Sequence, residues 1–203
     1  VSQLVLKALA QAVGVDSDID LGLDPDERLE VQTVRYKDPI EAILASHVRS
    51  VTVAPDGTSI ADRKMEGGLL SGSFDPLHDG HQRLAAAASD IIGMPVTFEL
   101  SIANVDKPSL EEREVRGRVQ QFSGNAPVIV SRAETFNKKA RLFPGCTFVI
   151  GYDTAVRLLH PRYYGGEESQ ALTSFVEMRD LGCRFLVAGR EADGGFRTLD
   201  ALD

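Results

Sequence analysis

Cysteine is scarce in this chain, and its two cysteines, Cys146 and Cys183, stand alone in the sequence. Neither belongs to a Cys-x-x-Cys pair or has a histidine nearby, so the pattern predicts neither a zinc site nor a disulfide framework. Isolated thiols of this kind are typical of buried apolar positions in a reducing compartment. We therefore expect a cytoplasmic protein with both thiols in its core.

Long hydrophobic runs are missing as well. No apolar stretch reaches the roughly 18 residues that a membrane-spanning helix needs, so no membrane partner is expected. Residues 1–7 lack a basic region ahead of their apolar stretch, which argues against a secretory signal. An initiator methionine is also absent, and we expect the chain to be a fragment of something longer.

Basic residues are few: the chain has 22 of them and 30 acidic residues, which gives a net charge of −8. This balance disfavours broad nucleic-acid binding. Residues 105–141 are the exception, because they carry more basic than acidic side chains, which suits a small anionic ligand. Arg113, Arg116 and Arg118 lie on one expected helix there, and its geometry lets at most two of them face the same ligand.

Short apolar stretches alternate with helical periodicity from about residue 66 onward. Strands are expected at 68–72, 96–102, 128–131, 147–150 and 184–188, and helices at 79–92, 109–122, 134–142, 153–159 and 171–181. This alternation predicts the α/β class and a Rossmann-like, doubly wound parallel sheet of about five strands.

Residues 1–65 carry no chemical motif, and we expect them to form a small α/β appendage that ends near residue 65. Helices are expected at 2–13 and 38–46, and strands at 28–36 and 50–54. Residues 66–203 would then form the main domain.

The chemistry of the chain is concentrated in residues 72–81, which read Gly-Ser-Phe-Asp-Pro-Leu-His-Asp-Gly-His. Because this segment follows an apolar strand and opens a helix, it is expected at the carboxyl edge of the sheet, where ligands bind. A helix N-terminus offers free N–H groups and a positive dipole end to an anion. His78 and His81 are three residues apart, so both can face the same phosphates. Gly72 and Gly80 let the backbone approach a nucleotide closely.

Residues 72–81 resemble the His-x-Gly-His signature of the cytidylyltransferase-like nucleotidyltransferase superfamily, and the resemblance covers roughly residues 66–190. It implies a Rossmann-like fold and a nucleoside triphosphate that carries Mg²⁺. It also implies attack by a phosphate of a small acceptor on the α-phosphorus, with release of pyrophosphate. No protein nucleophile and no metal ligand from the protein are implied, so catalysis would rest on positioning and charge neutralisation.

Within the superfamily, the chain most resembles the nicotinate/nicotinamide mononucleotide adenylyltransferases. Residues 148–153 resemble their Gly-x-Asp element, residues 185–190 resemble their late strand ending in arginine, and residues 104–108 fall where the family often places a phosphate-reaching lysine. The resemblance implies catalytic roles for His78, His81 and Lys107. It implies nucleotide binding by Gly72, Ser73, Phe74, Gly80, Gly151, Asp153 and Arg190.

One element of that family is missing. A second phosphate-binding signature, Ile-Ser-Ser-Thr-x-x-Arg or similar, normally lies near the C-terminus, and residues 196–203 contain none, so we expect the domain to be truncated there.

We predict transfer of an adenylyl group to a small phosphorylated acceptor such as nicotinic acid mononucleotide. Two alternatives stay open: a cytidylyltransferase acting on an alcohol or sugar phosphate, and a nucleotide-binding module without turnover. No oligomeric state is predicted.

Two further segments carry weaker signals. Residues 1–14 resemble the last helix of a CinA-like, nicotinamide mononucleotide amidase-type domain, which would imply a place in pyridine nucleotide metabolism. His160 is a candidate for lining the acceptor pocket.

Overall fold

The computed structural model describes residues 2–12, 14–24, 26, 38–106, 108–192 and 195–198. It divides the chain into two compact units, Val1–Arg35 and Tyr36–Asp203. Unit 1 contains helix α1, Ser2–Ala12, which confirms the first expected helix. The strand expected at 28–36 lies outside the described residues.

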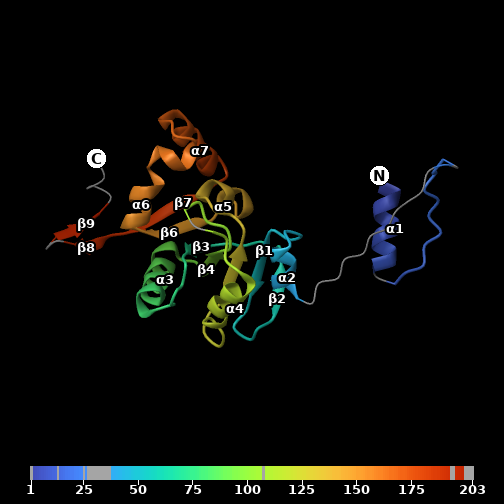
Figure 1. Ribbon diagram of the computed structural model, residues 1–203, viewed down its shortest axis with the longest axis horizontal. Coiled ribbons are helices and arrows are strands. Elements are labelled where there is room, and N and C mark those ends of the chain that lie inside the picture. The colour runs from blue at the N-terminus through green and yellow to red at the C-terminus, as the bar shows by residue number, and fades with distance from the viewer. Residues whose placement is uncertain are drawn as a thin grey trace. The chain divides into compact units, whose positions relative to one another are not determined.

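Unit 2 is built on a mixed seven-stranded sheet in the order β2-β1-β5-β4-β3-β6-β7 (Figure 1). Its five parallel strands are β3 (Gly68–Ser71), β4 (Val96–Ser101), β5 (Val128–Ser131), β6 (Thr147–Gly151) and β7 (Arg184–Ala188). β1 (Ser50–Val53) and β2 (Ser59–Ala61) extend this sheet antiparallel to β5 and to β1. The predicted α/β class and Rossmann-like parallel sheet are confirmed.

Helices cover both faces of the sheet. The helices are α2 (Pro39–Leu44), α3 (Asp79–Ile92), α4 (Glu112–Gln120), α5 (Phe136–Leu142), α6 (Tyr152–Leu158) and α7 (Glu168–Asp180), with a 3₁₀ turn, η1, at Pro161–Tyr164. Local signals explain several of their ends. The carboxylate of Asp38 accepts from the Glu41 N–H at 2.9 Å and starts α2, whose first residue is a proline, while Gly93 ends α3 with a φ of 70°. A short hairpin, β8 (Arg190–Ala192) and β9 (Gly195–Arg197), follows the sheet.

Two apolar clusters lie on opposite faces of the sheet, because successive side chains of a strand point to opposite faces. Leu70 and Val149 belong to the first cluster, together with residues of α2, α3 and α4. Leu69 and Phe148 belong to the second, with residues of α5, α6 and α7. Both faces of the central strands are therefore buried, which explains their nearly continuous apolar sequence.

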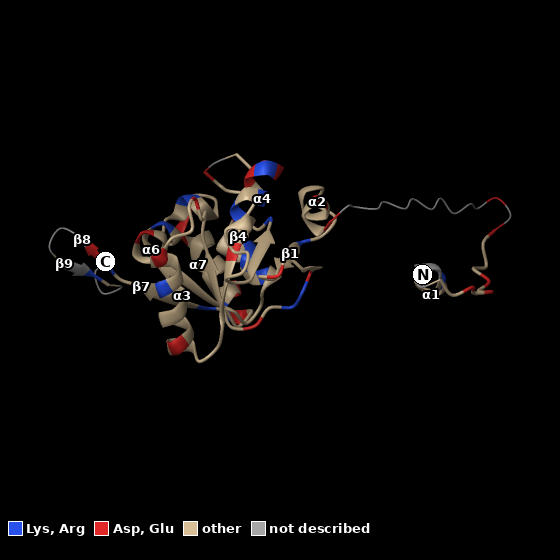
Figure 2. Ribbon diagram, turned by 90° about the horizontal axis from the view of Figure 1, so that it is seen from below, with Lys and Arg blue, Asp and Glu red and all other residues tan. Residues whose placement is uncertain are grey.

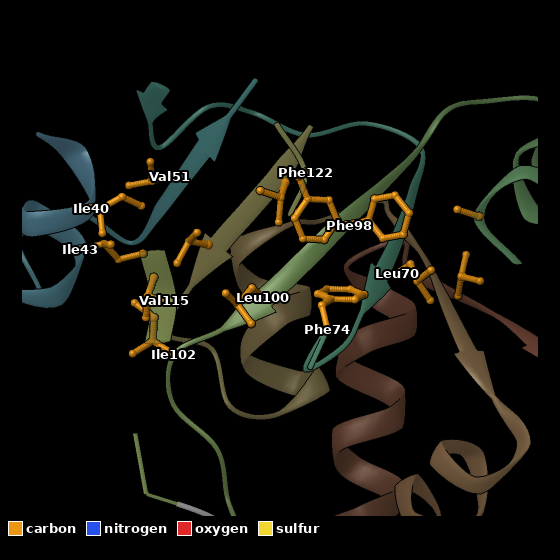
Figure 3. Close-up of a cluster of buried hydrophobic side chains, with 14 of the residues drawn as sticks. Ile40, Ile43, Val51, Leu70, Phe74, Phe98, Leu100, Ile102, Val115 and Phe122 are labelled. Atoms are coloured by element: carbon orange, nitrogen blue, oxygen red, sulfur yellow. The ribbon is translucent and has the colours of Figure 1, made fainter. Parts of the chain in front are cut away.

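The division of the structure does not coincide with the boundary expected near residue 65. β1 pairs along its whole length with β5, from Ser50 opposite Ser131 to Val53 opposite Val128. Figure 3 shows Ile40 and Ile43 of α2 beside Val51 in the same core cluster as the central strands. The segment from residue 38 onward is thus part of the sheet domain, because its apolar side chains complete that core.

Both cysteines are free and buried, as the sequence predicts, and they lie in the second cluster. Burial raises the pKa of the Cys146 thiol most, and the neighbouring Cys183 raises it further. In the part of the chain that the structure describes, no helix is long and apolar enough to cross a membrane.

Candidate functional site

The strand order creates a switch point beside β3. From β3 the chain adds β4 and β5 on one side, and then crosses over to add β6 and β7 on the other side. In open α/β sheets, such a switch leaves a crevice outside the carboxyl ends of the two strands that flank it. β3 ends at Ser71 and β6 ends at Gly151. The topology therefore places residues 72–81 and the Gly151–Asp153 element at the same edge of the sheet.

His78 and His81 lie together at the start of α3. Their rings are stacked, with centroids 3.8 Å apart and 26° between the ring planes. The backbone N–H of His78 donates to Nδ1 of His81 at 3.3 Å. Because Nδ1 accepts this bond, the neutral His81 ring carries its proton on Nε2, where it can donate to a phosphate oxygen. A Cβ at Gly80 would come within 3.0 Å of the His78 ring, so this glycine makes room for the stacked pair.

The half-buried position of His81 controls its charge. Burial lowers the pKa of His81, and the nearby His78 lowers it further. We expect an NMR titration of the free protein to give a midpoint below the ordinary value of about 6.5. Magnesium-bound ATP should raise that midpoint, because phosphate charge favours the imidazolium form.

The same shift makes stability depend on pH. Above the unfolded-state pKa of about 6.5, the contribution of His81 to the free energy of unfolding is fully present. As the pH falls from there through the lower folded-state pKa, this contribution is lost. A titration midpoint at or above 6.5 in the free protein would contradict this description of the site.

Phe74, expected to bind nucleotide, lies in the core. It is 1% exposed, and its ring meets Phe98 and Phe122 edge-on at centroid distances of 5.5 and 5.2 Å (Figure 3). The same ring meets His81 edge-on at 5.1 Å, so it supports the turn that carries the two histidines. A Cβ at Gly72 would lie 2.7 Å from the Phe74 ring, so the packing of Phe74 requires this glycine.

Gln121, which caps the C-terminal end of α4, holds the loop that precedes α3 through two hydrogen bonds. Its Nε2 donates to the carbonyl oxygen of Phe74 at 2.9 Å, and its Oε1 accepts from the Leu77 N–H at 2.8 Å. One side chain thus satisfies two backbone groups of a loop that has no regular hydrogen-bonding partner strand. The role of Gln121 could not be predicted from the sequence, because an amide that pairs with a distant loop leaves no local pattern.

Replacing Gln121 with alanine should destabilise the protein by about 2 kcal/mol, because two backbone groups lose their partners. The loop would also become free to move, so triphosphate affinity should fall. Denaturant unfolding and calorimetric titration with magnesium-bound ATP measure the two effects. The adjacent, exposed Gln120 provides the matched control, and an alanine there should change neither quantity. Equal effects of the two variants would show that Gln121 does not hold the loop.

Arg118 holds the same loop through charge. It donates to the carbonyl oxygen of Ser73 and pairs with the Asp75 carboxylate, both at 3.1 Å. Arg116 pairs with Asp38 and with an acidic residue of its own helix, and Figure 2 shows acidic and basic residues side by side on α4. In the structure, these two arginines therefore engage carboxylates and the turn itself.

Two further residues of the expected nucleotide site meet at the carboxyl edge. Arg190 and Asp153 form an ion pair, although both side chains are more than half exposed. Gly151 begins α6 in an extended conformation, and a Cβ added there would contact nothing within 4 Å. The edge next to this ion pair is open enough for a ligand to approach. A phosphate there would compete with Asp153 for the Arg190 guanidinium.

Lys107 lies outside the described residues. The preceding residue, Asp106, is held by side chains of the η1 turn. Asp106 accepts from the Tyr163 hydroxyl at 3.0 Å and pairs with Arg162 at 3.3 Å. This link joins the loop after β4 to the η1 turn.

A cavity of about 180 Å³ opens at this edge, between the loops after β4 and β5 on one side and α6 and η1 on the other. Its walls combine aromatic rings and neutral polar groups with the charged side chains of Asp106, Glu134 and Arg157; the rings and neutral groups are Asn104, Thr135, Phe136, Thr154, Tyr163 and Tyr164. Burial raises the pKa of Tyr164 to about 12, so its hydroxyl stays protonated at neutral pH. His160 does not line the cavity; its Nδ1 accepts from the Arg162 N–H at 3.3 Å. Aromatic and polar walls suit a small flat ring with polar substituents.

A charged pair is buried next to the site. Glu99 of β4 is 0% exposed and pairs with Lys139 of α5, which is 5% exposed. The Ser131 hydroxyl donates to the same carboxylate. The Lys139 ammonium also lies 6.0 Å from the centre of the Phe136 ring, which lines the cavity. The pair therefore fixes α5 against the sheet behind the cavity wall.

Comparison with known proteins leaves the function open. No protein-family model matches the chain, and no curated protein matches it. The crystal structure of a protein of unknown function from Archaeoglobus fulgidus is similar at 18% sequence identity and a TM-score of 0.35. The match covers 61% of this chain and 89% of that chain. Among the described residues, no group of three or more His, Cys, Asp or Glu side chains is arranged to hold a metal ion.

Proposed function

We propose that unit 2 is a nucleotidyltransferase that transfers an adenylyl group from ATP to a small phosphorylated acceptor and releases pyrophosphate. The observation that carries this proposal is the stacked His78–His81 pair at the N-terminus of α3, where β3 ends beside the switch point of the sheet. A helix N-terminus attracts phosphate through its free N–H groups, and two adjacent imidazoles add donors at the same point.

In the proposed reaction, a phosphate oxygen of the acceptor forms a bond to the α-phosphorus of ATP. The bond between that phosphorus and the oxygen bridging to the β-phosphate breaks, and its electron pair leaves with pyrophosphate. Nε2 of His81 and the ring of His78 would donate to oxygens that gain charge during this transfer. Mg²⁺ would arrive on the triphosphate, held by phosphate oxygens and water, which are the hard ligands that it prefers.

The acceptor would lie in the cavity between the loop after β4 and the η1 turn. Its size and its ring-and-hydroxyl walls fit a mononucleotide base such as that of nicotinic acid mononucleotide. Arg190 is the described cation closest in sequence to the end of β7, and it would bind a phosphate in exchange for Asp153.

Pyrophosphate release by the full chain tests the proposal. ATP and CTP are each combined with nicotinic acid mononucleotide, nicotinamide mononucleotide and glycerol 3-phosphate. Release with ATP and a mononucleotide supports the proposal. Faster release with CTP and glycerol 3-phosphate would favour a cytidylyltransferase, and equal rates with ATP and CTP would overturn the adenylyl preference. Tight triphosphate binding without release in any combination would favour a nucleotide-binding module instead.

A further inference from the structure

A second cavity, of about 320 Å³, lies where the antiparallel extension joins the parallel sheet. One wall is the connection from α2 to β1, with Val48 and Arg49, and the adjoining wall is the end of β5, with Arg132 and Ala133. These walls adjoin because Ser50, the first residue of β1, pairs with the last residue of β5. Residues of α5 close the third side. No residue lines both this cavity and the cavity beside η1.

The charges around this second cavity are of one sign. Arg49, Arg132, Lys138 and Arg141 line it, and its lining includes no carboxylate. The chain has more acidic than basic residues, so this grouping runs against the overall composition. Three of the four cations, Arg132, Lys138 and Arg141, belong to the locally basic stretch 105–141.

Two of the four cations form no salt bridge among the described residues, although the Glu134 carboxylate lies close enough to Arg132 to interact with it electrostatically. Lys138 pairs with Glu134, and Arg141 pairs with an acidic residue of α7. Within the part of the chain that the structure describes, neither Arg49 nor Arg132 has an ion-pair partner, and Arg132 donates only to a backbone carbonyl, at 3.3 Å. Two guanidinium groups that face one cavity repel each other until an anion lies between them. Their forked donors match the oxygens of a phosphate.

The remaining walls are apolar. Val48, Ala133 and Leu142 lie among the cations, so the cavity offers hydrocarbon surface next to a phosphate-binding rim. A volume of about 320 Å³ lies at the lower end of the range for small-molecule sites. Inorganic phosphate alone would leave the apolar surface uncovered, whereas a phosphate ester with an apolar or aromatic body would cover it.

We propose that this cavity binds a small organic phosphate with an apolar body, at a site separate from the His78–His81 turn. Arg49 and Arg132 bind the phosphate from adjoining walls, and Val48, Ala133 and Leu142 contact the body. The site does not depend on the proposed adenylyl transfer, and its occupancy can be measured without any turnover.

Phenyl phosphate is the probe, and amide chemical shifts of the isotope-labelled full chain report where it binds. We expect dose-dependent shifts at Val48, Arg49, Ala133 and Leu142. Inorganic phosphate should bind more weakly than phenyl phosphate, and phenol should not bind. Shifts confined to Gly80 and His81 would overturn the proposal, because they would place the probe at the triphosphate site. Equal affinity for phosphate and phenyl phosphate would overturn the apolar contact.

Charge reversal at Arg49 tests the site directly. The Arg49 side chain is exposed, and its backbone N–H keeps its bond to Asp62, so Arg49→Glu should fold normally. It should weaken phenyl phosphate binding by about tenfold or more, because a charge-assisted hydrogen bond is lost and a repulsion is added. Arg184→Glu, at the opposite, amino edge of the sheet, makes the same charge change and should leave the affinity unchanged. If both variants weaken binding equally, overall charge explains the effect and the site is ruled out.

Arg132→Gln adds a second, independent measurement from the adjoining wall. It should also weaken phenyl phosphate binding by about tenfold. His81→Ala should leave the affinity unchanged, which separates this site from the adenylyl-transfer site. Wild-type affinity in both Arg49→Glu and Arg132→Gln would overturn the proposal, whatever the outcome of the pyrophosphate assay.

Discussion

Replacing His81 with alanine is expected to slow pyrophosphate release by about a hundredfold or more, because one preorganised donor to the transferring phosphates is removed. The fold should survive this change. His81 is half-buried and touches Phe74 edge-on, a contact worth about 1 kcal/mol. The rate should therefore fall far more than stability does. Steady-state kinetics and thermal unfolding of the same preparation measure both effects.

The adjacent Gln82 gives a matched control, since it is exposed one position further along α3. Gln82→Ala should release pyrophosphate at the wild-type rate. An unchanged rate in His81→Ala would remove the histidine from the mechanism. A similar loss of rate in both variants would show that the start of α3 acts through its backbone and not through the imidazole.

Replacing Lys139 with methionine should destabilise the protein by about 3–5 kcal/mol, the largest stability effect that we expect. Methionine keeps much of the volume, but Glu99 would then be a fully buried carboxylate with no cation. The Ser131 hydroxyl would remain as its donor, which compensates only part of the lost interaction. Equilibrium unfolding in denaturant, followed by circular dichroism, gives the free energy of unfolding directly.

Lys138→Met is the control for this experiment, because Lys138 is the preceding residue of α5 and forms its ion pair at the surface. Surface pairs contribute about 1 kcal/mol or less, so Lys138→Met should have little effect. The double variant Glu99→Leu, Lys139→Met should recover most of the lost stability, since both buried charges are gone. Equal destabilisation by the two lysine variants would mean that the buried pair has no special energetic importance.

Local sequence patterns predicted most helices and strands of unit 2. The five parallel strands are largely apolar because both of their faces are buried. Such apolar stretches can be recognised in the sequence without knowing which strands pair with each other. α3 was predicted with its observed bounds, 79–92, because a strand-to-turn-to-helix transition has its own turn and capping residues. β2 was missed, since its three residues are too few to show a period.

The residues that support the site could not be found in this way. Phe74 was expected to bind the nucleotide, and the structure shows that its ring completes a core cluster with Phe98 and Phe122. Gln121 holds the loop across 44 sequence positions from Leu77. No local pattern marks Glu99 or Lys139, and only the fold shows that they are buried together. Each of these roles depends on a partner that is far away in the sequence.

The sequence by itself determined the α/β class, the alternation of strands and helices, and the position of the two histidines at the start of a helix, because each is recorded in the spacing of neighbouring residues. Only the tertiary structure decided that residues 38–61 belong to the sheet domain and that β3 and β6 flank the switch point of its sheet. It also decided that three cations of one basic stretch, Arg132, Lys138 and Arg141, line a separate cavity. The physical reason is that strand pairing and burial depend on contacts between distant segments, and local periodicity does not specify which segments meet.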